Sequence, residues 1–137
     1  MSLTINGKRF FGLTKVAKDY SLPLGEAAGM YGLTSKMRVL VMQGSPHGPI
    51  VAGEQEVYAL EKDVLHGLLT DDIFLGEGLL AEQDQRLIIP QRAANAYGLR
   101  PGREVALAAI GARGLVLIIR GHLLAAALEH RDDLWLE

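Results

Sequence analysis

The stretch 85-QRLIIPQRAANAYGLRPGREVALAAI-110 carries the clearest structural signals in this chain of 137 residues. Residues 86–89 are rich in branched apolar side chains, which predicts a strand. Pro90 suits the first position of a short alanine-rich helix, because its missing N–H is not needed there. Gly98 follows Tyr97 at the point where a helix end favours a left-handed residue. The stretch therefore predicts a strand, a short helix and a glycine cap in succession.

The residues after this helix predict a turn and a β-hairpin. Pro101 presets φ for a turn, and Gly102 is free to take a positive φ. Two apolar runs, 104-EVALAAI-110 and 115-LVLIIR-120, follow on either side of a tight glycine-containing loop. Both runs are apolar on both faces for much of their length, which predicts that a partner chain buries them.

The rest of the chain is less regular. Residues 37–42 predict a strand, residues 73–83 two strands broken at a pair of glycines, and residues 122–130 a helix. Residues 14–33 fit either two short helices, spaced as in a helix-turn-helix, or an irregular glycine-rich segment, and we favour the irregular segment. Residues 55–69 predict a strand followed by a short helix.

Residues 55–69 and 86–100 share the order strand, short helix, Gly-Leu, which raises the question of an internal repeat. The earlier segment lacks the proline, the Pro-Gly turn and the full hairpin of the later one. We therefore favour chance similarity over a true repeat of these two segments.

The order of elements after residue 77 resembles the AbrB/SpoVT-like swapped-hairpin domain of transition-state regulators and some antitoxins. The matching residues are 86-RLIIP-90, the Gly98-Leu99 step, 100-RPGRE-104 and the hairpin that follows. The resemblance implies an intertwined homodimer, or a higher even-numbered oligomer, in which exchanged hairpins close one barrel. We thus expect an α+β, mostly β protein with three parts, which are an N-terminal region of unassigned fold (1–76), the swapped-hairpin domain (77–121), and a C-terminal helix with an acidic tail (122–137).

The same resemblance implies DNA binding through arginines near the first hairpin and the short helix. Arg86 falls at the family's arginine before the Ile-Pro strand, and Arg92 lies in the helix. Gln85 stands where the family has glycine, and 94-ANAY-97 lacks the two adjacent basic residues of DNA-binding members. The full set of candidate DNA-binding residues is Arg86, Arg92, Arg100 and Arg103.

The charges of this chain are segregated, although its net charge is only -2. Residues 1–53 carry +4, residues 54–84 carry -8, residues 85–121 carry +5 and residues 122–137 carry -3. Arginine suits phosphate because its planar fork donates two parallel hydrogen bonds and stays charged. The arginine-rich segment therefore favours a nucleic acid, whereas the alternative is a solvated surface that pairs with the acidic segment of the same chain.

Little in the sequence points to catalysis, a metal or a membrane. The chain has no cysteine, which excludes disulfides and thiolate metal sites and fits a reducing cytoplasm. Its four histidines show no metal-binding spacing, and its acidic pairs look like turn and tail residues. We find no apolar run of about 20 residues and no signal peptide at the start. We expect no cofactor, no metal and no membrane partner.

The sequence therefore predicts a cytoplasmic, non-enzymatic transcriptional regulator that binds duplex DNA as a homodimer. The alternative is a dimeric scaffold that keeps the barrel without binding DNA, and a weaker one is a regulator that binds a small molecule through its N-terminal region. The arginine-rich segment favours DNA, the missing basic residues at Ala94 and Asn95 favour the scaffold, and the size of the region 1–76 leaves room for a ligand.

Overall fold

The computed structural model describes residues 2–34, 37–43, 45–70, 72–81, 86–110 and 114–136. Its strands form one antiparallel, curled sheet in the order β1-β2-β8-β9-β5-β4-β6-β7-β3. The strands are β1 (Leu3–Ile5), β2 (Lys8–Lys15), β3 (Ser21–Pro23), β4 (Arg38–Met42), β5 (Ile50–Gly53), β6 (Phe74–Leu80), β7 (Arg86–Ile88), β8 (Glu104–Ile110) and β9 (Gly114–Ile118). The helices are α1 (Glu26–Met30), α2 (Glu54–Tyr58), α3 (Lys62–Leu68), α4 (Gln91–Tyr97), α5 (Gly121–Glu129) and α6 (Arg131–Leu134).

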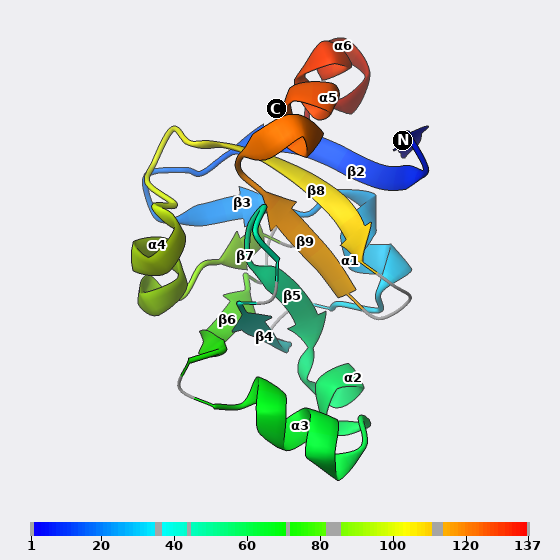
Figure 1. Ribbon diagram of the computed structural model, residues 1–137. Helices are drawn as coiled ribbons and strands as arrows, with labels where there is room; N and C mark the ends of the chain where they lie inside the picture. The colour runs from blue at the N-terminus through cyan, green and yellow to red at the C-terminus, as the bar shows by residue number, and fades with distance from the viewer. Residues whose placement is uncertain are drawn as a thin grey trace.

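The order of elements is the same in the two halves of the chain. The first half runs β2-β3-α1-β4-β5-α2-α3, and the second runs β6-β7-α4-β8-β9-α5-α6. In Figure 1, α2 and α3 lie at the opposite end of the molecule from α5 and α6, and α1 lies on the other side of the sheet region from α4. The two halves are therefore related by an approximate twofold rotation.

The halves exchange their hairpins. The β8–β9 hairpin of the second half pairs through β8 with β2, and the β4–β5 hairpin of the first half pairs through β4 with β6. Two further pairs join equivalent strands, since β3 pairs with β7 and β5 pairs with β9. Leu22 lies opposite Leu87 and Val51 opposite Leu115 in these ladders, which puts the pseudo-twofold axis near both pairs. Each half thus completes the sheet of the other.

The ends of α1 and α4 show the same relationship in sequence and in backbone. The segments 27-AAGMYGL-33 and 93-AANAYGL-99 align without a gap. Gly32 and Gly98 both have φ of 65°, in the left-handed region that favours glycine. The N–H of Leu33 donates to Ala28 O at 2.7 Å, and the N–H of Leu99 donates to Ala94 O at 2.9 Å. Both helices therefore end in the same glycine cap.

Three apolar clusters fill the molecule. The largest lies inside the curled sheet and takes residues from both halves, including Leu22, Leu87 and Leu107. A second lies outside β2, β8 and β9 beneath α5 and α6, and a third lies outside β4 and β5 beneath α2 and α3 (Figure 1). The two outer clusters occupy equivalent places, so each hairpin is covered by the pair of helices that follows it. This arrangement explains why the hairpin strands are apolar on both faces.

Several predictions for the second half are confirmed. The mostly β composition, the strand before Pro90, the helix after it and the hairpin are present. Gly102 has φ of 90°, as its turn requires. The hairpin tip at residues 111–113, including Arg113, lies outside the described residues.

Other predictions need correction. Residues 55–69, expected to begin with a strand, lie mainly in the helices α2 and α3. The described residues 73–81 contain one strand, β6, with an irregular register at Gly76, and residues 82 and 83 lie outside the described residues. Residues 14–33 contain the strand β3 and the helix α1 in place of two helices or an irregular segment. Residue 76, the last residue before the expected swapped-hairpin domain, lies within β6, and the division of the chain into domains stays a prediction. The counterpart of 86–100 is the segment around β3 and α1, which sequence reasoning did not compare with it.

Strand pairs β2–β8 and β3–β7 join the two halves of this chain, and the association of two copies stays a prediction. Of the helices in the described part of the chain, none combines the length and the apolar character that crossing a membrane requires.

Candidate nucleic-acid interface

Arg86 lies at the junction of the two halves. It belongs to β7, which pairs with β3 near the pseudo-twofold axis. Its Nε donates to Ser21 Oγ at 2.9 Å, and its Nη2 donates to Ser21 O at 3.4 Å. Ser21 Oγ in turn donates to Asp19 Oδ1 at 2.6 Å. Hydrogen bonds from the side chain and the backbone of Ser21 lower the pKa of Asp19, and the positive charge of Arg86 adds to this effect. Arg86 is therefore half-buried and held in place by the other half.

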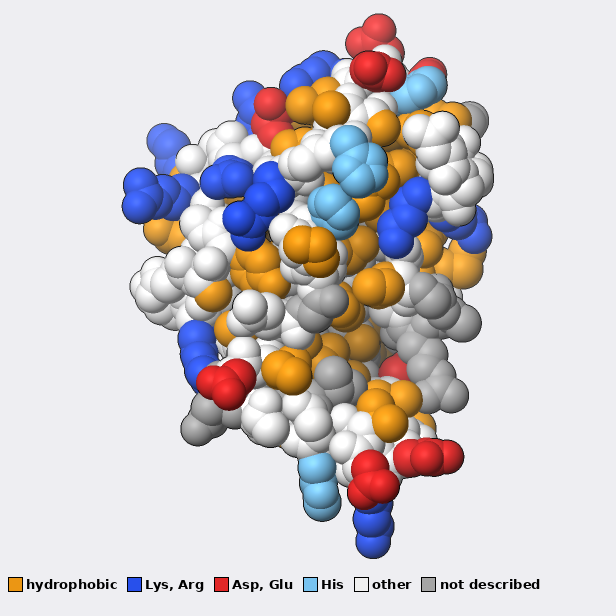
Figure 2. Space-filling model, viewed as in Figure 1, with side chains coloured by type: hydrophobic (Ala, Val, Ile, Leu, Met, Phe, Trp, Pro, Cys, Tyr) orange, Lys and Arg blue, Asp and Glu red, His pale blue; other side chains and the backbone are white. Residues whose placement is uncertain are grey.

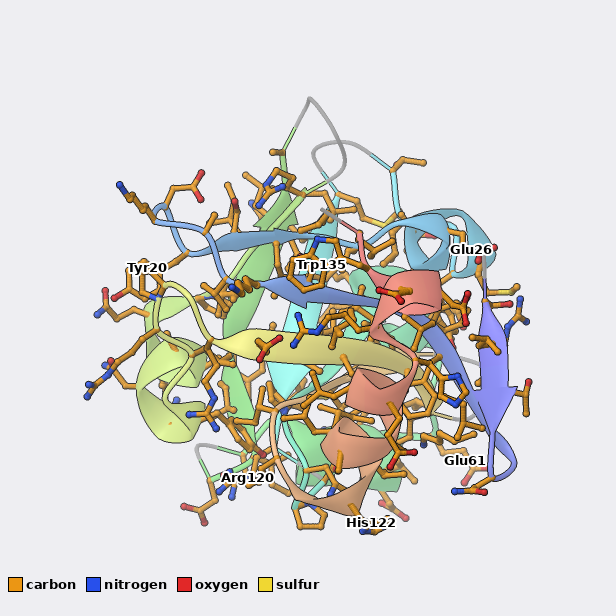
Figure 3. The ribbon with its side chains drawn as sticks, turned by 90° about the horizontal axis from the view of Figure 1, so that it is seen from above. Tyr20, Glu26, Glu61, Arg120, His122 and Trp135 are labelled. Atoms are coloured by element: carbon orange, nitrogen blue, oxygen red, sulfur yellow. The ribbon has the colours of Figure 1, made fainter. Side chains whose placement is uncertain are left out.

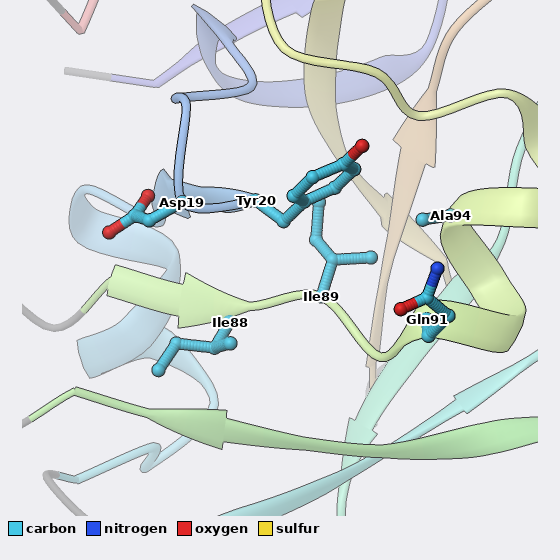
Figure 4. A pocket seen from close by; sticks show the side chains of 6 residues that line it. All are labelled: Asp19, Tyr20, Ile88, Ile89, Gln91 and Ala94. Atoms are coloured by element: carbon cyan, nitrogen blue, oxygen red, sulfur yellow. The ribbon is translucent and has the colours of Figure 1, made fainter.

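Tyr20 stands beside this network in an unusual backbone conformation. Its φ is 62°, which few residues other than glycine, asparagine and aspartate adopt. The backbone is held there because Tyr20 N–H donates to Ala17 O at 2.9 Å and Tyr20 O accepts from Ile89 N–H at 2.9 Å. The ring is 40% exposed and lies over a shallow pocket lined also by Asp19, Ile88, Ile89, Gln91 and Ala94 (Figure 4). An aromatic side chain is thus partly exposed to solvent one residue before Ser21, the partner of Arg86.

Arg92 is exposed in the first turn of α4, directly beyond the corner at Pro90 that links α4 to β7. Ala93, Ala94 and Tyr97 form the buried face of this short helix, whereas Asn95 is exposed. A basic residue in place of Ala94 would therefore point into the core and not toward a ligand. The departure at Ala94 has a packing reason, whereas Asn95 is exposed and could have been basic without disturbing the core.

Arg100 and Arg103 lie beyond the other end of α4. Arg103 donates from Nη2 to Ile119 O at 3.1 Å and from Nη1 to Gly98 O at 3.5 Å, so it ties the helix cap to the end of β9. Arg100 is exposed in the turn. Arg86 lies on β7 and Arg92 in the first turn of α4, whereas Arg100 and Arg103 follow the end of this helix, which spans about 10 Å over its seven residues.

Sequence reasoning missed Asp19, Tyr20 and Ser21, which contribute to the site from the first half. The contact between Ser21 and Arg86 joins residues 65 positions apart. The only signal for it was the Tyr-Ser-Leu-Pro stretch, which carries no motif by itself.

Neither a metal centre nor a known relative offers another interpretation. In the described ranges, no group of three or more His, Cys, Asp or Glu side chains is placed to hold a metal ion. Comparison of the chain with models of protein families, with curated proteins and with solved structures finds no match.

Proposed function

We propose that this chain is a DNA-binding regulator of the AbrB/SpoVT-like type, in which one chain supplies both halves of the swapped-hairpin barrel. The observation that carries the proposal is the exchange of hairpins, in which β8 pairs with β2 and β4 pairs with β6. The resemblance in the sequence of the second half implies this topology between two copies of a chain. Here the first half has the matching order of strands and helix.

The DNA-binding surface in this proposal is the face around β3, β7 and the start of α4. Half-buried Arg86 and exposed Arg92 supply positive charge for phosphate, and Lys18, which is also exposed, adds a third cation. Tyr20 supplies an exposed ring, which can pack against a sugar or stack on an unpaired base. Asp19 reduces the positive charge of this surface, and Ser21 ties it to Arg86. We therefore propose weak, mainly electrostatic binding.

A scaffold without DNA binding is the second candidate, and specific contacts favour it. The guanidinium groups of Arg86 and Arg103 already donate to Ser21 and to backbone carbonyls of this chain. An arginine with intramolecular partners loses those bonds, or shares them, when it binds phosphate. The absence of a basic residue at Asn95 points the same way.

A salt titration of binding to random duplex DNA separates the two candidates. We expect binding at about 50 mM salt that weakens steeply toward physiological salt. Arg92→Ala should flatten the log–log slope by about one, because one phosphate contact is lost. Arg38→Ala, an exposed arginine of β4 paired with Glu77 at 3.7 Å, is the matched control and should leave the slope unchanged. Absence of binding at the lowest salt would overturn the DNA proposal in favour of the scaffold.

Arg86→Ala tests the same surface at the junction of the halves. It should also flatten the slope by about one, but it removes the hydrogen bonds to Ser21, so its folding must be checked by circular dichroism. Association of two chains and a cytoplasmic location stay predictions. Light scattering at micromolar concentration tests the first, because the barrel pairing within one chain needs no second copy.

A further inference from the structure

Several cationic and imidazole side chains belong to, or contact, the segment where β9 ends and α5 begins. This group contains Arg103, Arg120, His47 and His122, and it includes none of Arg86, Arg92 and Tyr20. In the view from above, Arg120 and His122 lie along one side of the molecule, well away from Tyr20 (Figure 3). This group of side chains is therefore separate from the proposed DNA-binding surface.

The backbone of Ile119 connects two members of this group. Its N–H donates to His47 O at 2.9 Å, and its carbonyl accepts from Nη2 of Arg103 at 3.1 Å. Ile119 is buried, so these bonds fix the loop containing His47 and the guanidinium of Arg103 relative to the end of β9. Arg103 is thus held in one orientation, and its remaining N–H groups stay available on an exposed side chain.

Arg120 is positioned by an aromatic ring. Its guanidinium carbon lies 5.6 Å from the centre of the Tyr97 ring, within the range of a cation–π contact. Tyr97 is 8% exposed, and its hydroxyl donates to Ser45 O at 3.3 Å. Among the described residues, no carboxylate lies within ion-pair distance of Arg103 or Arg120. Their charges are therefore not balanced by a described acidic side chain.

The two histidines come from segments far apart in the chain. The rings of His47 and His122 lie edge to face, with centroids 5.3 Å apart. Gly121, between Arg120 and His122, makes this approach possible in two ways. Its φ is 81°, and a Cβ atom there would lie 3.0 Å from Nδ1 of His47. A larger residue at 121 would be strained and would push His47 away from His122.

The surroundings of this group contain few acidic residues. No Asp or Glu occurs in residues 27–53 or 105–128, which include β9, the start of α5 and the loop around His47. Figure 2 shows Lys and Arg side chains beside two histidines in the upper half of this face, and it shows acidic side chains at the top of the view as well as at the bottom. The segments that contain Arg120, His47 and His122 therefore add positive charge without a carboxylate of their own, which favours anions.

We propose that Arg103, Arg120, His47 and His122 form a binding site for a phosphate group. Two guanidinium groups held by Ile119 and Tyr97 match the oxygens of a phosphate, and each imidazole donates at least one N–H whether neutral or charged. The phosphate belongs either to a small phosphorylated ligand or to a nucleic-acid backbone. Because the guanidinium groups are positioned in advance, binding loses less side-chain entropy than at free surface arginines.

The test is a titration of the intact protein with pyrophosphate, followed by the NMR signals of the histidine imidazoles. We expect saturable shifts of His47 and His122, with smaller shifts of His66 and His130. Arg120→Gln should weaken binding by about tenfold or more, because a charge-assisted pair of hydrogen bonds is lost. Arg38→Gln is the matched control and should bind as the parent does. Lack of saturation, or an equal loss in both variants, would overturn the site.

A second titration, with duplex DNA in place of pyrophosphate, identifies the source of the phosphate. If Arg120→Gln weakens binding of both pyrophosphate and DNA, the site holds a backbone phosphate. If Arg120→Gln weakens pyrophosphate binding alone, the site holds a small phosphorylated ligand. Either of these two outcomes supports the proposed phosphate site. The site is independent of the DNA proposal, since Arg92→Ala should leave pyrophosphate binding unchanged. Loss of pyrophosphate binding in folded Arg92→Ala would count against a separate site at Arg120.

Discussion

The two halves of this chain follow one path with different surface charges. Strand, strand, helix and hairpin recur in the same order, and the buried alanines of α1 and α4 coincide in the alignment of 27–33 with 93–99. Extending that alignment places Glu26 at the position of Arg92, Thr34 at that of Arg100 and Met37 at that of Arg103. The buried pattern of the barrel is therefore present in both halves, whereas arginines occupy these three aligned positions in the second half only.

This difference has a consequence for any ligand that binds across the pseudo-twofold axis. A symmetric homodimer presents every arginine twice, once on each side of the axis. Arg86 lies opposite Pro23 in the ladder that joins β3 and β7, and β3 contains no arginine, so the first half lacks that arginine too. We therefore expect one-sided contact with DNA, and a loss of about one unit of salt slope per arginine where a symmetric dimer would lose two.

The largest effect is expected at the centre of the shared core. Leu22 and Leu87 lie opposite each other at the axis, and both are fully buried. Either leucine replaced by alanine should lower the free energy of unfolding by about 2–5 kcal/mol, because each leaves a cavity in the same cluster. Urea denaturation measures this loss. Leu79→Ala, at a position 45% exposed on β6, is the control and should cost much less.

The comparison of the halves makes the Leu22 result informative. If β3 and β7 are equivalent, the two alanine variants should have similar costs, and the double variant should deviate from additivity because the residues share one cavity. A cost at Leu22 within the error of the Leu79 control would show that the first half does not contribute equally to the core.

The next largest loss of stability is expected at the C-terminal caps of α1 and α4. Gly32 and Gly98 share φ of 65°, and a Cβ atom would meet no heavy atom within 4 Å at Gly32 and only Arg103 Nη1 at 3.6 Å at Gly98. The expected cost of Gly32→Val and Gly98→Val is therefore backbone strain, about 1–3 kcal/mol at each site. Thermal melts compare the two. Gly67→Ala in α3 is the control. Gly67 has open space for a Cβ atom and no positive φ, so this change should be neutral or stabilising. If both valine variants are as stable as the parent, the shared cap is refuted.

The second half was more readable from sequence because proline and glycine mark its boundaries. Pro90, Gly98 and Pro101 separate its strand, helix and turn, and the structure follows them. In the first half the matching strand β3 has three residues, as β7 has, but it contains Pro23, and the matching helix has five residues where α4 has seven. Such short elements owe their structure to tertiary pairing, and the partner strand β7 lies far along the chain.

The candidate site was predicted only in part for the same reason. Arg86 and Arg92 are close in sequence, so a local motif placed them together. Ser21 and Asp19 reach Arg86 only through the pairing of β3 with β7. His47 and His122 meet because Ile119 pairs with the loop before β5, which no local pattern reveals.

The smallest expected effect is a change in the salt slope of DNA binding. It tests whether the two halves differ in DNA binding through their surface charge alone. Glu26 begins α1 at the place where α4 has Arg92, and it lies apart from Glu61 on the surface (Figure 3). Glu26→Arg should restore the missing cation on the other side of the axis and steepen the salt slope of DNA binding by about one. Glu26→Gln removes only the negative charge and should strengthen binding with less change in slope.

Glu61→Arg makes the same change of charge at the start of α3, in the acidic segment. A general gain in positive charge would strengthen DNA binding equally at Glu26 and Glu61. A surface centred on β3 and β7 predicts a steeper slope for Glu26→Arg alone, because Glu26 begins the helix that directly follows β3, whereas Glu61 precedes α3. Fluorescence anisotropy across a salt series, with folding checked by circular dichroism, measures both. Equal slopes for the two arginine variants would place the DNA-binding surface away from the axis, and the asymmetry of the halves would then have no bearing on how the chain meets DNA.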